Sequence, residues 1–169
     1  KNLITGYQGG IYPVNPRYSE IDDLTCYASV KDVPDPVDLA IVFVPARAAV
    51  ESVRECAQRG IKGVMIQWAG FADTGDAGRD LQAELLAIKA EFGIRIWGPN
   101  CMGLVDAVNR HVFSFVLNTI WDDGLIPGNV SLIVQSGMLS AGFLIDTVSH
   151  GTMGISKACS IGNKVDVNE

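Results

Sequence analysis

Short, uninterrupted apolar runs alternate along this chain with segments that have helical spacing. Four runs rich in β-branched and aromatic residues occupy 10–14, 39–44, 63–68 and 94–97, and a Pro, Gly or Asn lies close behind each. Continuous apolar runs of this length are typical of strands that are buried on both faces. The four runs therefore predict the strands of one covered sheet.

The segments between these runs predict helices. Residues 46–59 and 76–92 carry apolar side chains three and four positions apart, so each segment has one apolar face. Gly60 and Gly93 follow them, where a helix C-terminus favours a residue with left-handed backbone. Strands that alternate with helices of these lengths indicate βαβ units, and hence an α/β fold with a parallel sheet.

The pattern changes after residue 100. Residues 101–125 hold one apolar run, 112–117, with no helix behind it, and Asp-Asp-Gly and Pro-Gly punctuate the end, which we interpret as a linker. A strand at 130–134, a helix through Val148 closed by Gly151, and a strand at 155–161 then begin a second βαβ unit. We predict two domains, 1–124 and 125–169. The second is too short to close an α/β layer, and the first lacks an opening strand, so we expect a longer protein.

The composition of the chain excludes several classes of protein. The 169 residues are 48% hydrophobic and 19% charged, which excludes a disordered chain, and no run approaches the roughly 20 apolar residues of a membrane span. No signal-peptide pattern opens the chain. Four dispersed cysteines and two histidines argue against zinc and indicate reduced thiols in the cytoplasm. A net charge of −6 argues against nucleic acid as a partner.

Four loops are candidates for ligand binding. In an open parallel sheet the ligand lies beyond the carboxyl ends of the strands, where the loops converge. The loops at 15–17, 45–47, 69–71 and 98–103 combine Gly or Pro with small or polar residues, which lets a ligand approach the backbone closely. Ordinary turn geometry explains any one of them alone, but four at one edge of a sheet indicate a ligand crevice.

The order of short motifs resembles the CoA-binding domain of nucleoside-diphosphate-forming acyl-CoA synthetases. This family includes ADP-forming acetyl-CoA synthetase and the α subunit of succinyl-CoA synthetase. The motifs are IYPVNP at 11–16, VDLA at 37–40, VPA at 44–46, AGF at 69–71 and GPNCMG at 98–103. GNVS at 128–131, VQSG at 134–137 and SIGN at 160–163 resemble the start of the family's next domain. The resemblance implies a Rossmann-like CoA-binding domain followed by the beginning of a flavodoxin-like domain.

The resemblance also implies a CoA site. Arg17 lies in or beside the position of a basic residue that contacts a CoA phosphate, a role that suits the guanidinium fork, although a solvated loop charge is the alternative. Loops at 44–45 and 67–70 would flank the pantetheine arm, and Asn100 and Cys101 would lie near the thiol. The implied CoA-binding residues are Val14, Asn15, Pro16, Arg17, Val44, Pro45, Gln67, Trp68, Ala69, Gly70, Asn100 and Cys101.

Two further positions bear on the chemistry. No His or Asp is placed to activate Cys101, and the family uses the sulfur of CoA, so Cys101 is not expected to be a nucleophile. A strand followed at once by Ser136, Gly137 and a helix suits a phosphate, although an ordinary Ser N-cap fits the same pattern. In the family this helix N-terminus steadies a phosphohistidine, so we predict phosphate contacts there. Ala141 and Gly142 lack the aromatic side chain of the succinate enzyme, which argues against succinate.

The resemblance implies that the whole protein makes an acyl-CoA from a carboxylic acid, CoA and ATP, through an acyl phosphate and a phosphohistidine, with release of ADP and phosphate. Neither His111 nor His150 has the expected glycine-rich setting, so we expect the phosphohistidine beyond Glu169 and no catalytic residue or metal ligand within this chain. The family's glycine-rich CoA loop would precede Lys1. ATP and Mg²⁺ would bind elsewhere, on an ATP-grasp domain or subunit, within an oligomer.

Two other functions stay open on the sequence alone. The same domain could be a non-catalytic, CoA-binding regulatory module, for example beside a protein acetyltransferase domain. It could also be a Rossmann domain that binds a nicotinamide dinucleotide. The chain has no Gly-x-Gly-x-x-Gly, but that motif would stand before Lys1.

Overall fold

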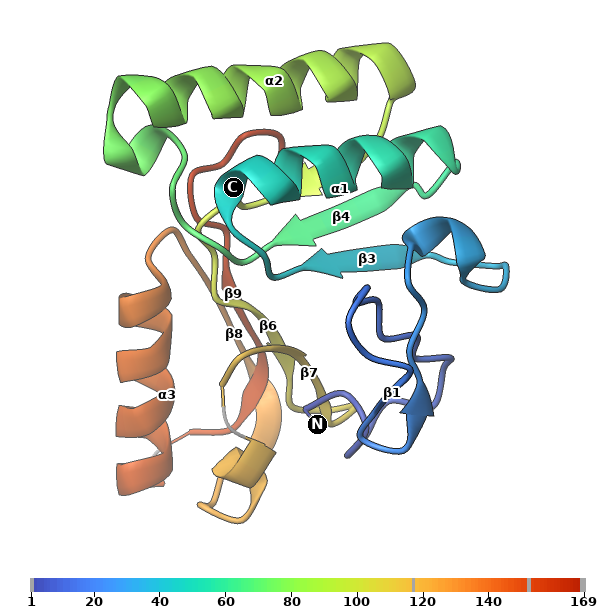
Figure 1. Cartoon of the computed structure of the whole chain (residues 1–169). Helices are drawn as coiled ribbons and strands as arrows, with labels where there is room; N and C mark the ends of the chain where they lie inside the picture. Colours follow the sequence, from blue (N-terminus) through green and yellow to red (C-terminus); the bar gives the residue numbers. More distant parts are fainter. Residues whose placement is uncertain (1, 117, 152, 168–169) are drawn as a thin grey trace.

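The computed structural model describes residues 2–116, 118–151 and 153–167, which form two larger sheets and a separate two-stranded hairpin (Figure 1). The first sheet is parallel and has the order β3-β4-β5, and the second is mixed and has the order β7-β6-β9-β8. The first sheet consists of β3 (Leu39–Val42), β4 (Gly63–Ile66) and β5 (Arg95–Trp97). The second consists of β6 (Gly103–Asp106), β7 (His111–Ser114), β8 (Pro127–Val134) and β9 (Ile155–Ser160).

Three helices cover these sheets (Figure 1). The helices α1 (Ala46–Gln58) and α2 (Asp76–Phe92) lie side by side over the parallel sheet, and α3 (Gly137–His150) packs against β8 and β9. Short 3-10 turns occupy η1 (Val30–Asp32), η2 (Ala72–Thr74) and η3 (Asn118–Trp121). The predicted α/β fold is confirmed, and so are its three helices.

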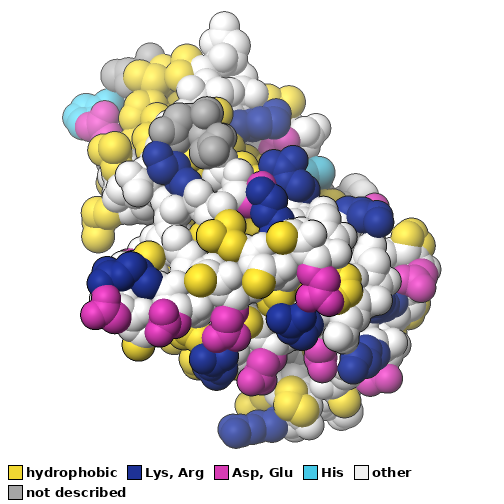
Figure 2. Space-filling model, turned by 90° about the horizontal axis from the view of Figure 1, so that it is seen from above, with side chains coloured by type: hydrophobic (Ala, Val, Ile, Leu, Met, Phe, Trp, Pro, Cys, Tyr) yellow, Lys and Arg dark blue, Asp and Glu magenta, His cyan; other side chains and the backbone are white. Residues whose placement is uncertain are grey.

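Each helix forms where the apolar spacing predicts it and ends at a residue that suits a helix end. Val50 and Val53 of α1 and Leu85 and Ile88 of α2 are buried against the parallel sheet. Gly93 closes α2 with φ 71°, a left-handed conformation that costs glycine nothing. The outer faces of α1 and α2 carry both signs of charge interspersed (Figure 2). The helices therefore turn their polar sides outward and their apolar sides toward the sheet.

The predicted strand at 10–14 is wrong. Among the described residues only one parallel bridge, between Val14 and Tyr27, pairs this segment with another. Two short strands that the sequence did not predict, β1 (Glu20–Ile21) and β2 (Leu24–Thr25), form a hairpin just after it. An apolar run becomes a strand only when a neighbouring strand accepts its backbone hydrogen bonds, and that partner is not visible in the run itself.

The predicted linker at 101–125 is also wrong, because it contains β6 and β7. These strands form an antiparallel hairpin, and β6 pairs in turn with β9. Asp106 shapes the hairpin turn, since its carboxylate accepts hydrogen bonds from the backbone N (3.0 Å) and the side-chain Nδ2 (2.9 Å) of Asn109. The hairpin thus shares a sheet with β8 and β9. The division into 1–124 and 125–169 stays a prediction.

The segment after β9 returns to the first sheet and runs beside β5. Backbone nitrogens of Val165 and Val167 donate to the carbonyls of Gly98 and Ile96, each at 3.1 Å. Asp166 lies between them with only 5% of its side chain exposed, and its carboxylate pairs with Lys89 Nζ and Arg95 Nε, each at 2.7 Å. These contacts fasten the second sheet to the first.

Asp166→Asn should destabilise the protein, more at neutral than at acid pH. Burial alone would raise the pKa of this carboxyl, but hydrogen bonds from Lys89, Arg95 and the backbone N of Ile96 outweigh burial and lower the pKa to about 2. A lowered carboxyl pKa stabilises the fold above the ordinary pKa and loses that effect as the pH falls. We expect a loss of about 1 to 2 kcal/mol in the free energy of unfolding at neutral pH.

Chemical denaturation measures this effect. The difference between Asp166→Asn and the unsubstituted protein should shrink as the pH is lowered from about 4 toward 2. Glu84→Gln serves as the control, because Glu84 pairs with Arg47 at the exposed surface of α1 and α2. Equal stability of the Asp166 variant and the parent at neutral pH would contradict the assignment.

Candidate functional site

The loop after β5 places one polar and one sulfur side chain at the junction of the two sheets. Gly98 and Gly103 flank it with φ of 94° and 93°. A Cβ at Gly98 would lie 2.4 Å from the carbonyl oxygen of Ile66, and one at Gly103 would lie 2.2 Å from that of Phe113. Only glycine fits both positions, and the loop then exposes Asn100 and buries Cys101, which is 2% accessible.

Cys101 is a neutral thiol. Its Sγ lies 3.3 Å from the carbonyl oxygen of Ile66, and burial raises its pKa to about 12. Because the thiolate is the nucleophilic form of cysteine, a thiol with this pKa is unreactive near neutral pH. The geometry agrees with the expectation that Cys101 does not act as a nucleophile.

A cavity of about 510 Å³ opens beside this loop and joins residues from both halves of the chain. Gln67, Asn100 and Cys101 come from loops of the first sheet, and Ser136 and Gly137 come from the start of α3. The remaining lining residues are Met102, Phe115, Gln135, Met138, Ala141, Gly162 and Asn163. The residues predicted to lie near a thiol and the residues predicted to bind a phosphate therefore line the same cavity, which we call the junction cavity.

The N-terminus of α3 is built as the sequence predicts. Ser136 is the N-cap, and its Oγ accepts a hydrogen bond from the backbone N of Leu139 at 3.3 Å. The first turn carries no acidic side chain. The first N–H groups of a helix have no partner within it, and the helix dipole adds partial positive charge there. This end of the junction cavity is therefore suited to an anion.

A polar network that the sequence did not predict fixes the rim of the cavity. The carboxylate of Asp73 accepts from the backbone N of Gly70 and of Phe71, each at 3.0 Å, and from Asn163 Nδ2 at 2.9 Å. Asn100 Nδ2 reaches Asn163 Oδ1 at 3.5 Å. Burial would raise the pKa of Asp73, but these hydrogen bonds lower it. The network joins the loops after β4, β5 and β9.

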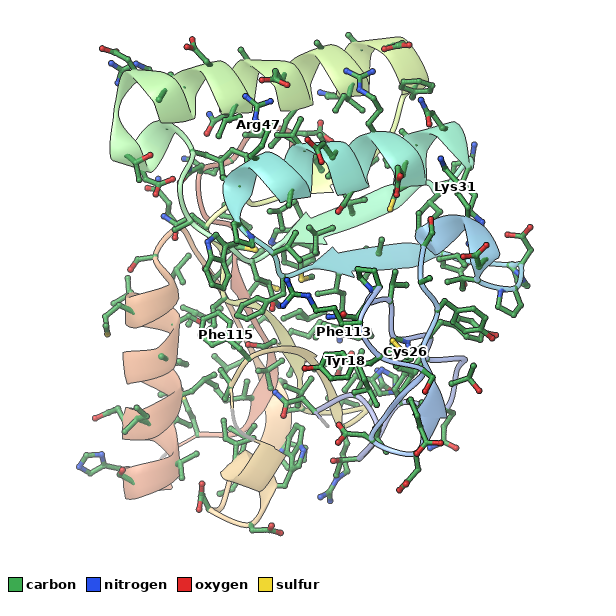
Figure 3. The ribbon with its side chains drawn as sticks, viewed as in Figure 1. Tyr18, Cys26, Lys31, Arg47, Phe113 and Phe115 are labelled. Carbon is green, nitrogen blue, oxygen red and sulfur yellow. The ribbon has the colours of Figure 1, made fainter. Side chains whose placement is uncertain are left out.

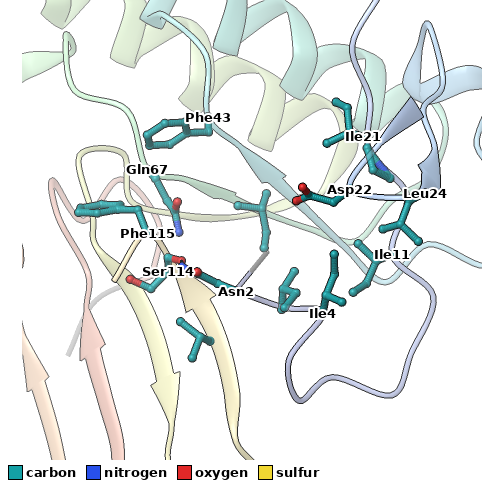
Figure 4. Close-up of a pocket in the computed structure, with 14 residues that line it drawn as sticks. Asn2, Ile4, Ile11, Ile21, Asp22, Leu24, Phe43, Gln67, Ser114 and Phe115 are labelled. Carbon is teal, nitrogen blue, oxygen red and sulfur yellow. The ribbon is translucent and has the colours of Figure 1, made fainter. Parts of the chain in front are cut away.

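A second cavity, of about 470 Å³, adjoins the junction cavity and shares Gln67 and Phe115 with it (Figure 4). Gln67 Nε2 donates to the carbonyl oxygen of Phe113 at 3.0 Å, which fixes this amide between the two cavities. Phe43 packs edge-on against Trp68 with 5.2 Å between ring centroids, and lies 6.2 Å from Phe115. These three half-exposed rings form an aromatic rim at the carboxyl ends of β3 and β4.

The other predicted residues lie outside the linings of these two cavities. The loops after β3 and β4 do approach each other, because a Cβ at Gly70 would lie 3.3 Å from that of Ala46. Asn15 Oδ1 accepts from the backbone N of Arg17 at 2.9 Å and so holds the 14–17 turn. The Arg17 guanidinium is exposed, and no hydrogen bond or ion pair joins it to another described residue. The remaining residues of this group are Val14, Pro16, Val44, Pro45, Trp68 and Ala69.

A family model described as a CoA binding domain matches residues 1–107. The chain belongs to the CoA-binding domain family. This match supports CoA as the ligand and favours it over a nicotinamide dinucleotide. Among the described residues, no group of His, Cys, Asp and Glu side chains is arranged to hold a metal ion, and no helix has the length and apolar character to span a membrane.

Relatives of this CoA-binding domain are found in acid–CoA ligases. The chain is 42% identical over 169 residues to the acetate–CoA ligase [ADP-forming] II subunit alpha of Pyrococcus furiosus. The match covers 99% of this chain and 35% of that protein. It is 40% identical over 166 residues to the acetate–CoA ligase [ADP-forming] II of Archaeoglobus fulgidus. That match covers 97% of this chain and 24% of the relative. The predicted resemblance to ADP-forming acyl-CoA synthetases is confirmed.

Two solved structures are similar to this chain in both fold and sequence. Acetyl-coenzyme A synthetase 1 of Ca. Korarchaeum cryptofilum, in complex with phosphate and ADP, superposes with a TM-score of 0.89 at 34% identity, covering 99% of this chain and 35% of that one. A protein of Pyrococcus horikoshii OT3 gives the same TM-score at 39% identity, with 99% and 37% covered. The chain thus spans between 24% and 37% of the length of these four proteins.

Alkylation tests the state of Cys101. Because burial keeps this thiol protonated, iodoacetamide at a pH of about 8 should leave Cys101 unmodified in the folded protein, as read by peptide mass spectrometry. The same protein unfolded in guanidinium is the control, and all four cysteines should then react. Rapid modification of Cys101 in the folded protein would show that the thiol is reactive after all.

Proposed function

We propose that this chain is the CoA-binding part of an ADP-forming acid–CoA ligase. The whole protein would convert a carboxylic acid, CoA and ATP into an acyl-CoA, ADP and phosphate. The observation that carries the proposal is the junction cavity, because Asn100 and Cys101 line one part of it and Ser136 and Gly137 line another. A thiol and a phosphate bound there would lie within one cavity.

This arrangement suits acyl transfer from an acyl phosphate to CoA. The CoA sulfur attacks the acyl carbon, a C–S bond forms, the bond from that carbon to the phosphate oxygen breaks, and phosphate leaves with the electron pair while the thiol proton passes to solvent. Backbone N–H groups at Ser136 and Gly137 stabilise the phosphate charge. Asn100, held by Asn163, orients the thiol end of CoA by hydrogen bonding.

The remaining parts of the reaction belong to regions outside this chain. In our proposal the phosphohistidine lies beyond Glu169, and ATP and Mg²⁺ bind an ATP-grasp domain or subunit of a cytoplasmic, oligomeric enzyme. The division into a CoA-binding domain, 1–124, and the start of a flavodoxin-like domain, 125–169, is part of the same proposal. The nucleotide end of CoA would lie against Val14–Arg17, with the pantetheine arm beside Pro45 and Gly70.

The activity can be measured directly on the full-length protein. With ATP, CoA and a panel of carboxylic acids we expect ADP, phosphate and an acyl-CoA in equal amounts, and an acid-labile phosphoryl group on a histidine. Tight CoA binding without turnover or labelling would instead indicate the regulatory module. Binding of NAD without binding of CoA would contradict both functions.

Arg17→Ala should weaken CoA binding to the full-length protein about tenfold, or about 1.4 kcal/mol, through loss of a phosphate contact. Isothermal titration calorimetry measures this effect. Pantetheine, which has no phosphate, should bind the variant and the parent equally. Arg54→Ala is the matched control, since Arg54 is an exposed arginine on α1 that pairs with Glu91. An equal loss of affinity for pantetheine would show that Arg17 acts through the fold of the loop.

A further inference from the structure

The side chain of Asn163 joins two parts of the site, because it donates hydrogen bonds on one side and accepts one on the other. Its Nδ2 donates to Asp73 Oδ1 at 2.9 Å and to Gln82 Oε1 at 3.2 Å. Its Oδ1 accepts from Asn100 Nδ2 at 3.5 Å. The backbone N of Asn163 donates to the carbonyl oxygen of Pro99 at 2.8 Å, so the residue is fixed beside the loop that carries Asn100.

Asp73 decides which way the Asn163 amide faces. An amide has a donor end and an acceptor end of nearly the same shape, so its partners fix its orientation. Burial would raise the pKa of the Asp73 carboxyl, but its hydrogen bonds lower it, so the group is ionised near neutral pH and can only accept. Gln82 acts in the same way, since its Oε1 also accepts from the backbone N of Ala72 at 3.4 Å. Asn163 must therefore turn its Nδ2 to Asp73 and its Oδ1 to Asn100.

The orientation of Asn163 in turn sets that of Asn100. Because Asn163 offers an oxygen, Asn100 presents its Nδ2 there and turns its own Oδ1 to the other side. Asn100 and Asn163 both line the junction cavity, and Phe115, a third lining residue, lies between the first sheet and α3 (Figure 3). The end of the Asn100 amide that points away from Asn163 is therefore a hydrogen-bond acceptor.

We propose that Asp73 is a positioning residue of the CoA site, which acts through Asn163 to turn the acceptor end of Asn100 toward the thiol end of CoA. The proposal rests on the proposed function, in which Asn100 lies beside that end. The S–H of CoA and the amide N–H nearest to it are both donors, and an acceptor of fixed orientation holds them in place for reaction. An amide turned the other way would meet either donor with its own N–H.

Isothermal titration calorimetry of the full-length protein tests this role with two ligands, CoA and adenosine 3′,5′-bisphosphate, which carries the nucleotide end of CoA without the pantetheine arm. Asp73→Asn keeps the shape of the side chain but replaces one oxygen by an N–H donor. It should weaken CoA binding about tenfold and leave binding of the bisphosphate unchanged. Asp76→Asn is the matched control, since Asp76 is an exposed aspartate in the first turn of α2 that pairs with Arg79. Unchanged affinity of Asp73→Asn for CoA, or an equal loss for both ligands, would overturn the proposal.

Two further variants separate the orientation of the amides from the turn that Asp73 also holds at Gly70 and Phe71. Asn163→Ala removes the link to Asn100 but leaves that turn, and it should give the same selective loss of affinity for CoA. Asp73→Asn combined with Gln82→Glu moves the acceptor-only carboxylate to the other partner of Asn163 Nδ2. Affinity for CoA should then return to within about threefold of the parent. A double variant as weak as Asp73→Asn would show that Asp73 acts through the turn alone, against the proposal.

The two proposals fail in different ways. If the full-length protein binds CoA but forms no acyl-CoA from any acid, the ligase function is wrong, and the titrations still decide the role of Asp73. If it forms acyl-CoA and Asp73→Asn binds CoA as the parent does, the ligase function stands and the positioning role is wrong. Absence of CoA binding by the parent would overturn both.

Discussion

The return of the chain after β9 onto the first sheet is the constraint on which the site depends. Backbone hydrogen bonds join 163–167 to 96–99, and Asp166 inserts its carboxylate between Lys89 and Arg95. The two sheets have separate cores, and this return joins them together with the hydrogen bonds from Gln67 to Phe113 and from Trp97 to Ser160. The junction cavity exists because these two cores are held in one orientation, with Gly162 packed so closely under Pro99 that a Cβ would lie 2.1 Å from its carbonyl oxygen.

Much of the fold could be predicted from the sequence because its signals are local. The spacing of apolar residues in α1 and α2, and the left-handed glycine after α2, reflect interactions within a few turns of one helix. The strand predicted at 10–14 and the linker predicted at 101–125 failed for the opposite reason. Whether Val14 or Val112 lies in a strand depends on a pairing segment elsewhere in the chain. Neither an alternating nor a continuous apolar pattern identifies that segment.

The candidate site likewise contains some residues that local sequence motifs indicate and others that they do not. Asn100, Cys101, Ser136 and Gly137 belong to recognisable motifs, and the structure places all four in one cavity. Asn163 ends the SIGN motif, but the sequence predicts a role in the site neither for it nor for Asp73, because their roles arise only when three loops meet. The Asp73 turn left a faint signal, since an aspartate two or three residues after Gly70 and Phe71 is placed to accept their N–H groups. Nothing local could show that Asn163, 90 residues away, completes the carboxylate's hydrogen bonds.

The buried thiol of Cys101 has a consequence for the purity of the proposed reaction. An activated acyl group acylates any thiolate within reach, so a cysteine beside such a group is a competitor of the incoming CoA. Lying against the Ile66 carbonyl, Cys101 stays protonated and cannot compete. In the proposed reaction, a neutral Cys101 lining the cavity would leave CoA as the only thiol that accepts the acyl group. An unreactive cysteine at this position is therefore a requirement for selective transfer of the acyl group to CoA.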